Sequence, residues 1–115
     1  MSTRTVKYPV ATTTSHLGNL RVTTYHSTDV ITTSPNYTIY NTGGWETATT
    51  KSRMNQFGDP RCYVFQKNFS FFLQDAEGEA YEFSGECIIV DGSGRFLHSS
   101  PNIYKAHEWL KENGR

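Results

Sequence analysis

The stretch that most clearly predicts the fold runs from residue 61 to residue 90 and has the sequence RCYVFQKNFSFFLQDAEGEAYEFSGECIIV. Aromatic and β-branched residues, which favour strands, alternate here with short polar or glycine-containing segments that favour turns. The pattern predicts four strands, at residues 61–66, 69–75, 79–84 and 87–90. They form a β-meander, in which neighbouring strands pair antiparallel.

Hydrophobic side chains in this stretch recur at every second position, as they do in strands with one buried face. Phe69, Phe71 and Leu73 are predicted to share one face. Tyr81 and Phe83 are predicted to share a face in the next strand, opposite a polar face. The meander therefore has one buried side and one side in contact with water.

The N-terminal half carries the same kind of signal in a weaker form. β-Branched residues dominate residues 19–25 and 29–33 and predict two strands. Turn residues at 34–36 then lead into a third alternating strand at 37–41. Residues 1–18 are rich in serine and threonine, and we expect a loosely ordered lead-in or an edge strand there.

A short helix is predicted in the middle of the chain, near residues 49–57. The segment Thr42-Gly43-Gly44 ends the strand pattern before it. Three threonines are candidates for the N-cap residue of this helix: Thr47, Thr49 and Thr50. Gly58 suits the C′ position, where many helices end in a glycine.

A second helix is predicted at the C-terminus. Ser99-Ser100-Pro101 places a serine cap before a proline at the first helical position. Ile103, Ala106 and Leu110 follow at helical spacing. The whole pattern predicts an α+β fold of mostly antiparallel β-sheet in meanders, with a short central helix and a C-terminal helix, in a single domain spanning residues 1–115.

Composition limits the classes of function. The formal net charge is zero, so the chain has no general attraction to nucleic acid or membranes. No apolar run approaches the ~20 residues of a membrane helix, and the first residues lack the apolar segment of a secretory signal. We expect an intracellular protein without a membrane partner. Cys62 and Cys87 lack CxxC spacing and are predicted to be reduced core residues.

Acidic residues gather in and around one predicted hairpin: Asp75, Glu77, Glu79, Glu82 and Glu86. Such a cluster forms either a solvated face or an acidic docking edge for a basic partner. Both interpretations remain open at the level of the sequence.

The junction between the two glycines and the central helix is the strongest candidate for a binding site. Backbone N–H groups after the glycines, threonine hydroxyls and two basic side chains could together hold a phosphate or another anion. The candidate residues are Gly43, Gly44, Trp45, Thr49, Thr50, Lys51, Arg53 and Asn55. The alternative is an ordinary tight turn with a threonine cap, in which Trp45 anchors the core.

Ligands for a metal or groups for hydrolysis are scattered along the chain without a recognised spacing. No metal and no cofactor is therefore predicted. A small hydrolase using His26 and Asp29 is kept as a secondary hypothesis, although these residues also suit a turn between two strands.

Exposed aromatic residues provide a further argument for nucleic-acid binding. Tyr63, Phe65 and Phe69 flank Lys67, and sheets that bind single strands stack bases on such rings. The alternative is that these rings build the core.

One segment of the sequence resembles a known pattern. His26-Ser27-Thr28-Asp29-Val30-Ile31 is followed by NTGGWETATTKSRMN at residues 41–55. This segment resembles small proteins of unknown function from tailed bacteriophages that share an NTGGWxTxTTKxRMN-like motif. The resemblance implies a small phage accessory protein that acts in the host cytoplasm, on a host defence or nucleic-acid process.

We therefore expect a binding protein rather than an enzyme. The first hypothesis is a phage accessory factor that binds a host protein or nucleic acid through the Gly43-Gly44 loop and the polar face of the following helix. The second is a small-ligand or nucleotide binder that uses the same junction, and the third is the small hydrolase. A homo-oligomer remains open.

Overall fold

The computed structural model of the chain describes residues 12–115, and this part confirms the predicted α+β class. Antiparallel strands dominate, and the two helices lie in the middle and at the C-terminal end. In chain order the elements are β1 (Thr12–Leu17), β2 (Leu20–Tyr25), β3 (Thr28–Ser34), β4 (Tyr37–Asn41), α1 (Ala48–Phe57), β5 (Tyr63–Lys67), β6 (Ser70–Gln74), β7 (Ala80–Glu82), β8 (Cys87–Asp91), β9 (Phe96–Ser100) and α2 (Ile103–Glu112).

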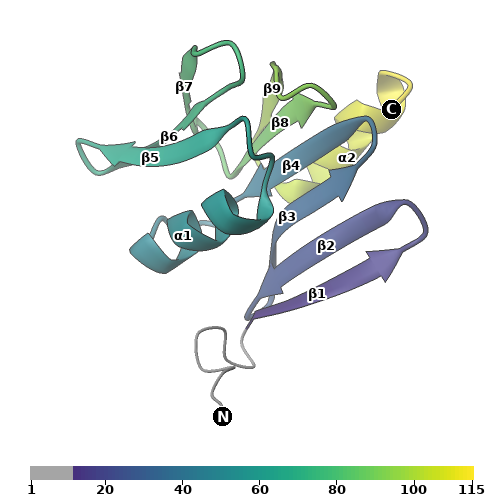
Figure 1. The fold of residues 1–115 in the computed structure, drawn as a ribbon, viewed down its shortest axis with the longest axis horizontal. Helices are drawn as coiled ribbons and strands as arrows, with labels where there is room; N and C mark the ends of the chain where they lie inside the picture. Colours follow the sequence, from purple (N-terminus) through teal and green to yellow (C-terminus); the bar gives the residue numbers. More distant parts are fainter. Residues whose placement is uncertain (1–11) are drawn as a thin grey trace.

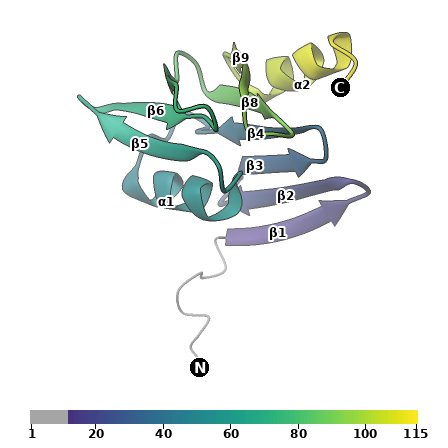
Figure 2. The ribbon, with the colours of Figure 1, turned by 45° about the horizontal axis from the view of Figure 1, so that its top comes forward.

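The strands form two antiparallel sheets. The larger has six strands in the order β1-β2-β3-β4-β8-β9, and the smaller has the order β5-β6-β7. The predicted meander of residues 61–90 is therefore confirmed for its first three strands and wrong for the fourth, because β8 pairs with β4 and β9 in the large sheet and not with β7. The helix α2 packs on one face of the large sheet, whereas α1 and the small sheet cover the other face (Figure 1 and Figure 2). The large sheet is thus the middle layer of three.

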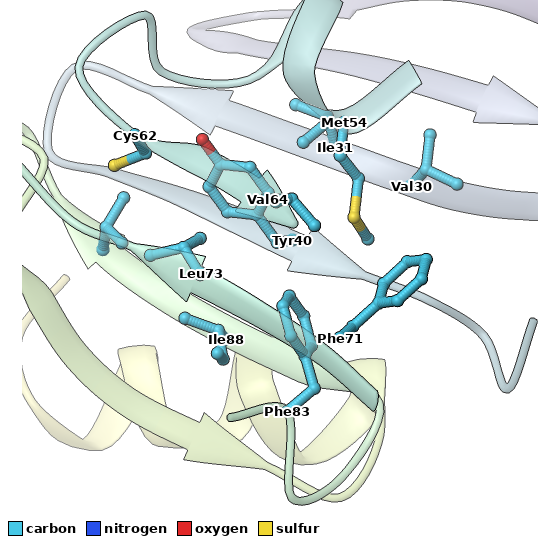
Figure 3. Packing of buried hydrophobic residues seen from close by; sticks show 11 residues of the cluster. Val30, Ile31, Tyr40, Met54, Cys62, Val64, Phe71, Leu73, Phe83 and Ile88 are labelled. Carbon is cyan, nitrogen blue, oxygen red and sulfur yellow. The ribbon is translucent and has the colours of Figure 1, made fainter. Parts of the chain in front are cut away.

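Two hydrophobic cores follow from this layering. In β4 and β8 successive side chains point to opposite faces, so that each strand contributes to both cores. Tyr40 and Ile88 pack in the larger core beneath α1 and the small sheet, as Figure 3 shows. Their chain neighbours Ile39 and Ile89 pack in the smaller core beneath α2.

Tyr40 also explains the end of α1. Its ring is 1% exposed, and its hydroxyl oxygen accepts a hydrogen bond of 2.8 Å from the backbone N–H of Asp59. A Cβ on Gly58 would lie 2.5 Å from this hydroxyl oxygen, so only glycine fits between the helix and the ring. The helix ends at Phe57, as predicted, but Gly58 is its C-cap and not its C′ residue, and its φ angle of −81° lies outside the left-handed region. Glycine is required here because of the close approach.

The side chain of Asn55 joins α1 to the small sheet. Its amide nitrogen donates to the Val64 carbonyl oxygen at 2.9 Å, and its amide oxygen accepts from the Val64 N–H at 2.7 Å. This pair of bonds replaces a neighbouring strand at the free edge of β5. Asn55, a candidate binding residue from the sequence, therefore has a structural role in this position.

Other local predictions differ from the structure in instructive ways. Of the three candidate caps of α1, Thr47 is the one used, because its Oγ1 accepts from the Thr50 N–H at 3.2 Å. The prediction that a serine caps α2 is wrong. Ser100 is the last residue of β9 and pairs with Cys87, and Asn102 caps the helix.

The placement of Phe69 beside Phe71 and Leu73 was also wrong. Phe69 lies in the turn before β6 with a φ of 68°, and its side chain is 93% exposed. For residues 1–18 the edge-strand alternative is confirmed over Thr12–Leu17, whereas residues 1–11 lie outside the described part.

Both cysteines are free and buried, as predicted. The Cys62 thiol donates to the Gly94 carbonyl oxygen at 3.3 Å, and the Cys87 thiol donates to Asn41 Oδ1 at 3.4 Å. Burial raises the pKa of Cys62 to about 11 and that of Cys87 to about 12.

Replacing Asn55 should loosen α1. Asn55→Ala leaves the N–H and C=O groups of the buried Val64 without these partners, and we expect a loss of about 2 kcal/mol in the free energy of unfolding, measured in urea. Ser52→Ala is the matched control on the same helix, because Ser52 is exposed, and should change stability by less than about 0.5 kcal/mol. Equal effects of the two variants would contradict the role of Asn55.

The raised thiol pKa values predict a stability that falls at high pH. An unfolded chain loses these protons near pH 9.0, whereas the folded chain keeps them to about pH 11 and 12. The free energy of unfolding in urea should therefore decrease as the pH rises above 9, because deprotonation favours the unfolded state. At pH 8 a thiol-specific reagent should label neither cysteine until guanidinium chloride is added. Rapid labelling of the folded protein would show that the thiols are accessible.

Candidate functional site

The structure brings together two groups of candidate residues that are separate in the sequence. The turn between β2 and β3, which contains His26, lies against the loop that follows β4, which contains Gly43 and Trp45. A Cβ on Gly43 would lie 2.6 Å from the Thr28 Cγ2 atom, and Gly43 has a φ of 62°. Glycine is therefore needed at position 43 for both its conformation and its contact with the turn.

A pocket of about 450 Å³ opens between this turn and the start of α1. Its lining is mainly apolar and aromatic with hydroxyl groups at intervals, and it contains no carboxylate. The lining residues are Tyr25, His26, Ser27, Thr28, Val30, Thr42, Trp45, Thr47 and Thr50. Three of the predicted site residues, His26, Trp45 and Thr50, are among them.

Three aromatic side chains define the pocket. Trp45 is 66% exposed, so it is not the core anchor that the alternative interpretation required. The rings of Tyr25 and His26 lie 4.4 Å apart between centroids, and His26 has a φ of 57°, which is uncommon for a residue with a side chain. The turn therefore holds the His26 ring beside Tyr25 in a backbone conformation that costs energy.

Arg53 supports Tyr25 from within the structure. Its guanidinium carbon lies 5.5 Å from the centre of the Tyr25 ring, at a cation–π distance. Its Nε donates to Thr12 Oγ1 at 3.0 Å, and the residue is only 9% exposed. Arg53 positions the pocket wall, whereas the sequence had suggested that it faces a ligand from an exposed helix surface.

The N–H groups of the two glycines are used inside the loop. The Gly43 N–H donates to Asn41 Oδ1 at 2.9 Å, and the Gly44 N–H donates to Thr42 Oγ1 at 3.2 Å. The loop therefore does not present these two groups to an anion. What it presents to the solvent is the Trp45 side chain.

The remaining helix candidates do not form one exposed face. Thr50 is buried, and its Oγ1 accepts from the Thr47 hydroxyl at 3.1 Å, while Thr49 and Lys51 are half-buried. With Asn55 bonded to β5, only part of the predicted polar face is available to a partner. The candidate site shifts from the helix to the pocket beside its N-terminus.

Asp29 belongs to a second, more polar cleft on the other side of the contact between Thr28 and Gly43. This cleft has a volume of about 380 Å³. Asp29 accepts a hydrogen bond of 2.8 Å from the Thr24 hydroxyl, and within residues 12–115 no hydrogen bond joins it to His26. The pair thus lacks the contact that a base and its orienting carboxylate need in the hydrolase hypothesis.

Within the described residues, no group of three or more His, Cys, Asp or Glu side chains is arranged to hold a metal ion. No helix in this part of the chain is long and apolar enough to cross a membrane.

Several lining residues had not been predicted, namely Tyr25, Ser27, Thr28, Val30 and Thr42. Four of them lie in the segments that resemble the phage pattern, but none carries a local signal for ligand binding. They become part of a site only because the turn at residues 25–28 meets the loop after β4. The glycine at position 43 was the one local signal of a close backbone approach.

Comparison with known proteins identifies a family. No curated protein and no solved structure matches the chain. The profile of the family described as Kyanoviridae Gp96 protein matches residues 5–90, which include the pocket, α1 and both strands that flank the turn at residues 25–28. This match covers most of the chain and agrees with the phage resemblance of the sequence. The chain is therefore a phage protein that belongs to the Kyanoviridae Gp96 protein family.

Proposed function

We propose that this phage accessory protein acts in the host cytoplasm and binds a nucleic acid or another host macromolecule by taking one planar group into the pocket beside Trp45. The observation that carries the proposal is the pocket itself. Its volume of about 450 Å³ lies in the range of sites for small ligands or single chemical groups. Its lining includes the exposed Trp45, whose large indole ring is suited to stacking.

An unpaired nucleobase fits the chemistry of this lining. Bases of single strands stack on aromatic rings, and Trp45, Tyr25 and His26 supply three of them. The hydroxyls of Ser27 and Thr28 can donate to or accept from the polar edge of a base. No carboxylate lines the pocket, so none lies directly against a phosphate that enters it.

A free nucleotide or another small ligand is the second candidate. The volume of the pocket favours this candidate, because it is large enough to hold a small molecule that is not part of an oligonucleotide. The two candidates differ in how affinity depends on length. A single strand gains affinity as nucleotides are added, whereas a mononucleotide binder does not.

The decisive experiment is a titration of fluorescently labelled single-stranded oligonucleotides, followed by anisotropy, with unlabelled mononucleotides as competitors. We expect Trp45→Ala to weaken binding by at least about fivefold, since stacking on one aromatic side chain contributes about 1–3 kcal/mol. Phe69→Ala is the matched control, because it removes an exposed aromatic ring that does not line the pocket. If neither oligonucleotides nor mononucleotides bind, the nucleobase assignment is wrong.

Lys51 should contribute less than Trp45 to oligonucleotide binding, and its contribution should depend on the salt concentration. It lies in the first turns of α1, near the pocket residues Thr47 and Thr50. If it approaches a phosphate, Lys51→Ala should reduce the slope of log Kd against log salt by about one. Lys105→Ala on α2 is the control, because Lys105 pairs with Glu108 and lies on a different element. An unchanged slope in Lys51→Ala would exclude a phosphate contact at this residue.

A further inference from the structure

The outer face of the small sheet carries a row of aromatic rings. Val64, Phe71 and Leu73 point inward and are fully buried, so their neighbours in β5 and β6 point outward. Phe65 is the register partner of Phe72, and their ring centroids are 5.5 Å apart with planes within 12°.

Tyr63 extends the row. It is 56% exposed, and its centroid lies 6.3 Å from that of Phe65. Together Tyr63, Phe65 and Phe72 form what we call the aromatic row. It shares no residue with the pocket beside Trp45.

Phe69 adds a fourth ring at the tip of the hairpin between β5 and β6. Asn68 has a φ of 53° and Phe69 a φ of 68°, so two residues with side chains occupy the left-handed region. This conformation suits Asn and Gly, but for a bulky residue it is strained. The Phe69 ring is 93% exposed and takes part in none of the ring contacts within residues 12–115. The folded protein therefore gains nothing visible from a phenylalanine here, which points to a role in binding.

Charged groups beside the aromatic row favour a basic partner. Glu82 is the register partner of Phe72, so its carboxylate lies next to the row on the outer face. Glu82 is exposed, and within the described part of the chain it forms no ion pair. Glu77 is partly neutralised by Arg95 at 3.4 Å. Lys67, at the tip, is the basic residue of this face.

Nucleic acid is the less suitable occupant beside Phe72, because a phosphate there would approach the carboxylate of Glu82. An arginine or lysine can instead lie over an aromatic ring and pair with a carboxylate beside it. The β5 edge is not available for strand addition, since Asn55 occupies the N–H and C=O groups of Val64. A partner must therefore approach the face of the sheet.

We propose that the aromatic row, Phe69 and Glu82 form a docking surface for a partner protein, which presents a segment of alternating basic and apolar side chains. The apolar side chains cover Phe69 and the row, and a basic one pairs with Glu82. This surface shares no residue with the pocket, so the two sites can be tested separately.

The test is an NMR titration of the ¹⁵N-labelled protein at low salt with a short synthetic peptide of alternating arginine and leucine. A peptide of alternating glutamate and leucine and a short oligo(dT) serve as comparison probes. The arginine peptide should shift amide resonances of β5, β6 and the Asn68–Phe69 turn, and the glutamate peptide should not. Glu82→Lys should weaken binding about tenfold, whereas Lys67→Glu should strengthen it, since the two reversals change the charge of the same face in opposite directions.

Phe69→Gly separates binding from folding. Glycine adopts a positive φ without strain, so this variant should unfold at a higher urea concentration and yet bind the arginine peptide more weakly. Unchanged peptide affinity in both Phe69→Gly and Glu82→Lys would overturn the proposal. It would also be overturned if oligo(dT) shifted the same resonances more strongly, or if they shifted with protein concentration alone, since the face would then bind nucleic acid or a second copy. A Trp45→Ala variant should bind the peptide normally, so failure of the pocket assignment would leave this result intact.

Discussion

The structure depends on the pairing of β4 with β8 and on the requirement that both faces of this pair be covered. All residues of β4 and four of the five in β8 are buried, so this strand pair has buried side chains on both of its faces. A sheet with two apolar faces needs a layer on each side. The helix α2 supplies one layer, and the chain between β4 and β8 returns as α1 and the small sheet to supply the other.

This arrangement also places the pocket. The ladder between β4 and β8 continues one step further, because the Thr42 N–H donates to the Glu86 carbonyl oxygen at 2.8 Å. Beyond this bond the chain leaves the sheet and turns through the two glycines toward α1. The loop is thus held at its base by the centre of the fold, while Gly43 rests against Thr28. The result is a firmly supported site that presents Trp45 to solvent.

Two turns combine an exposed aromatic ring with an unfavourable backbone conformation. His26 borders the pocket and Phe69 marks the end of the aromatic row, and both have a positive φ angle. Strain of this kind costs about 1–3 kcal/mol and persists where the surrounding structure enforces it. In a chain of 115 residues that is a noticeable part of the total stability. The pocket and the docking surface therefore share a physical feature, although they differ in chemistry and lie on different sheets.

The sequence by itself determined the local structure. β-Branched residues, period-two alternation and turn residues predicted the strands from β2 to β8. Turn signals predicted α1, and helical spacing predicted α2, because these patterns depend on neighbours along the chain. Only the tertiary structure decided that β4 pairs with β8, that Gly43 meets Thr28, and that Asn55 and Arg53 turn inward. It also decided that Phe69 lies outside the core and that Asn102 caps α2. The physical reason is that such contacts join residues far apart in the chain, or depend on where a strand pair ends, and neither leaves a periodic signal in the sequence.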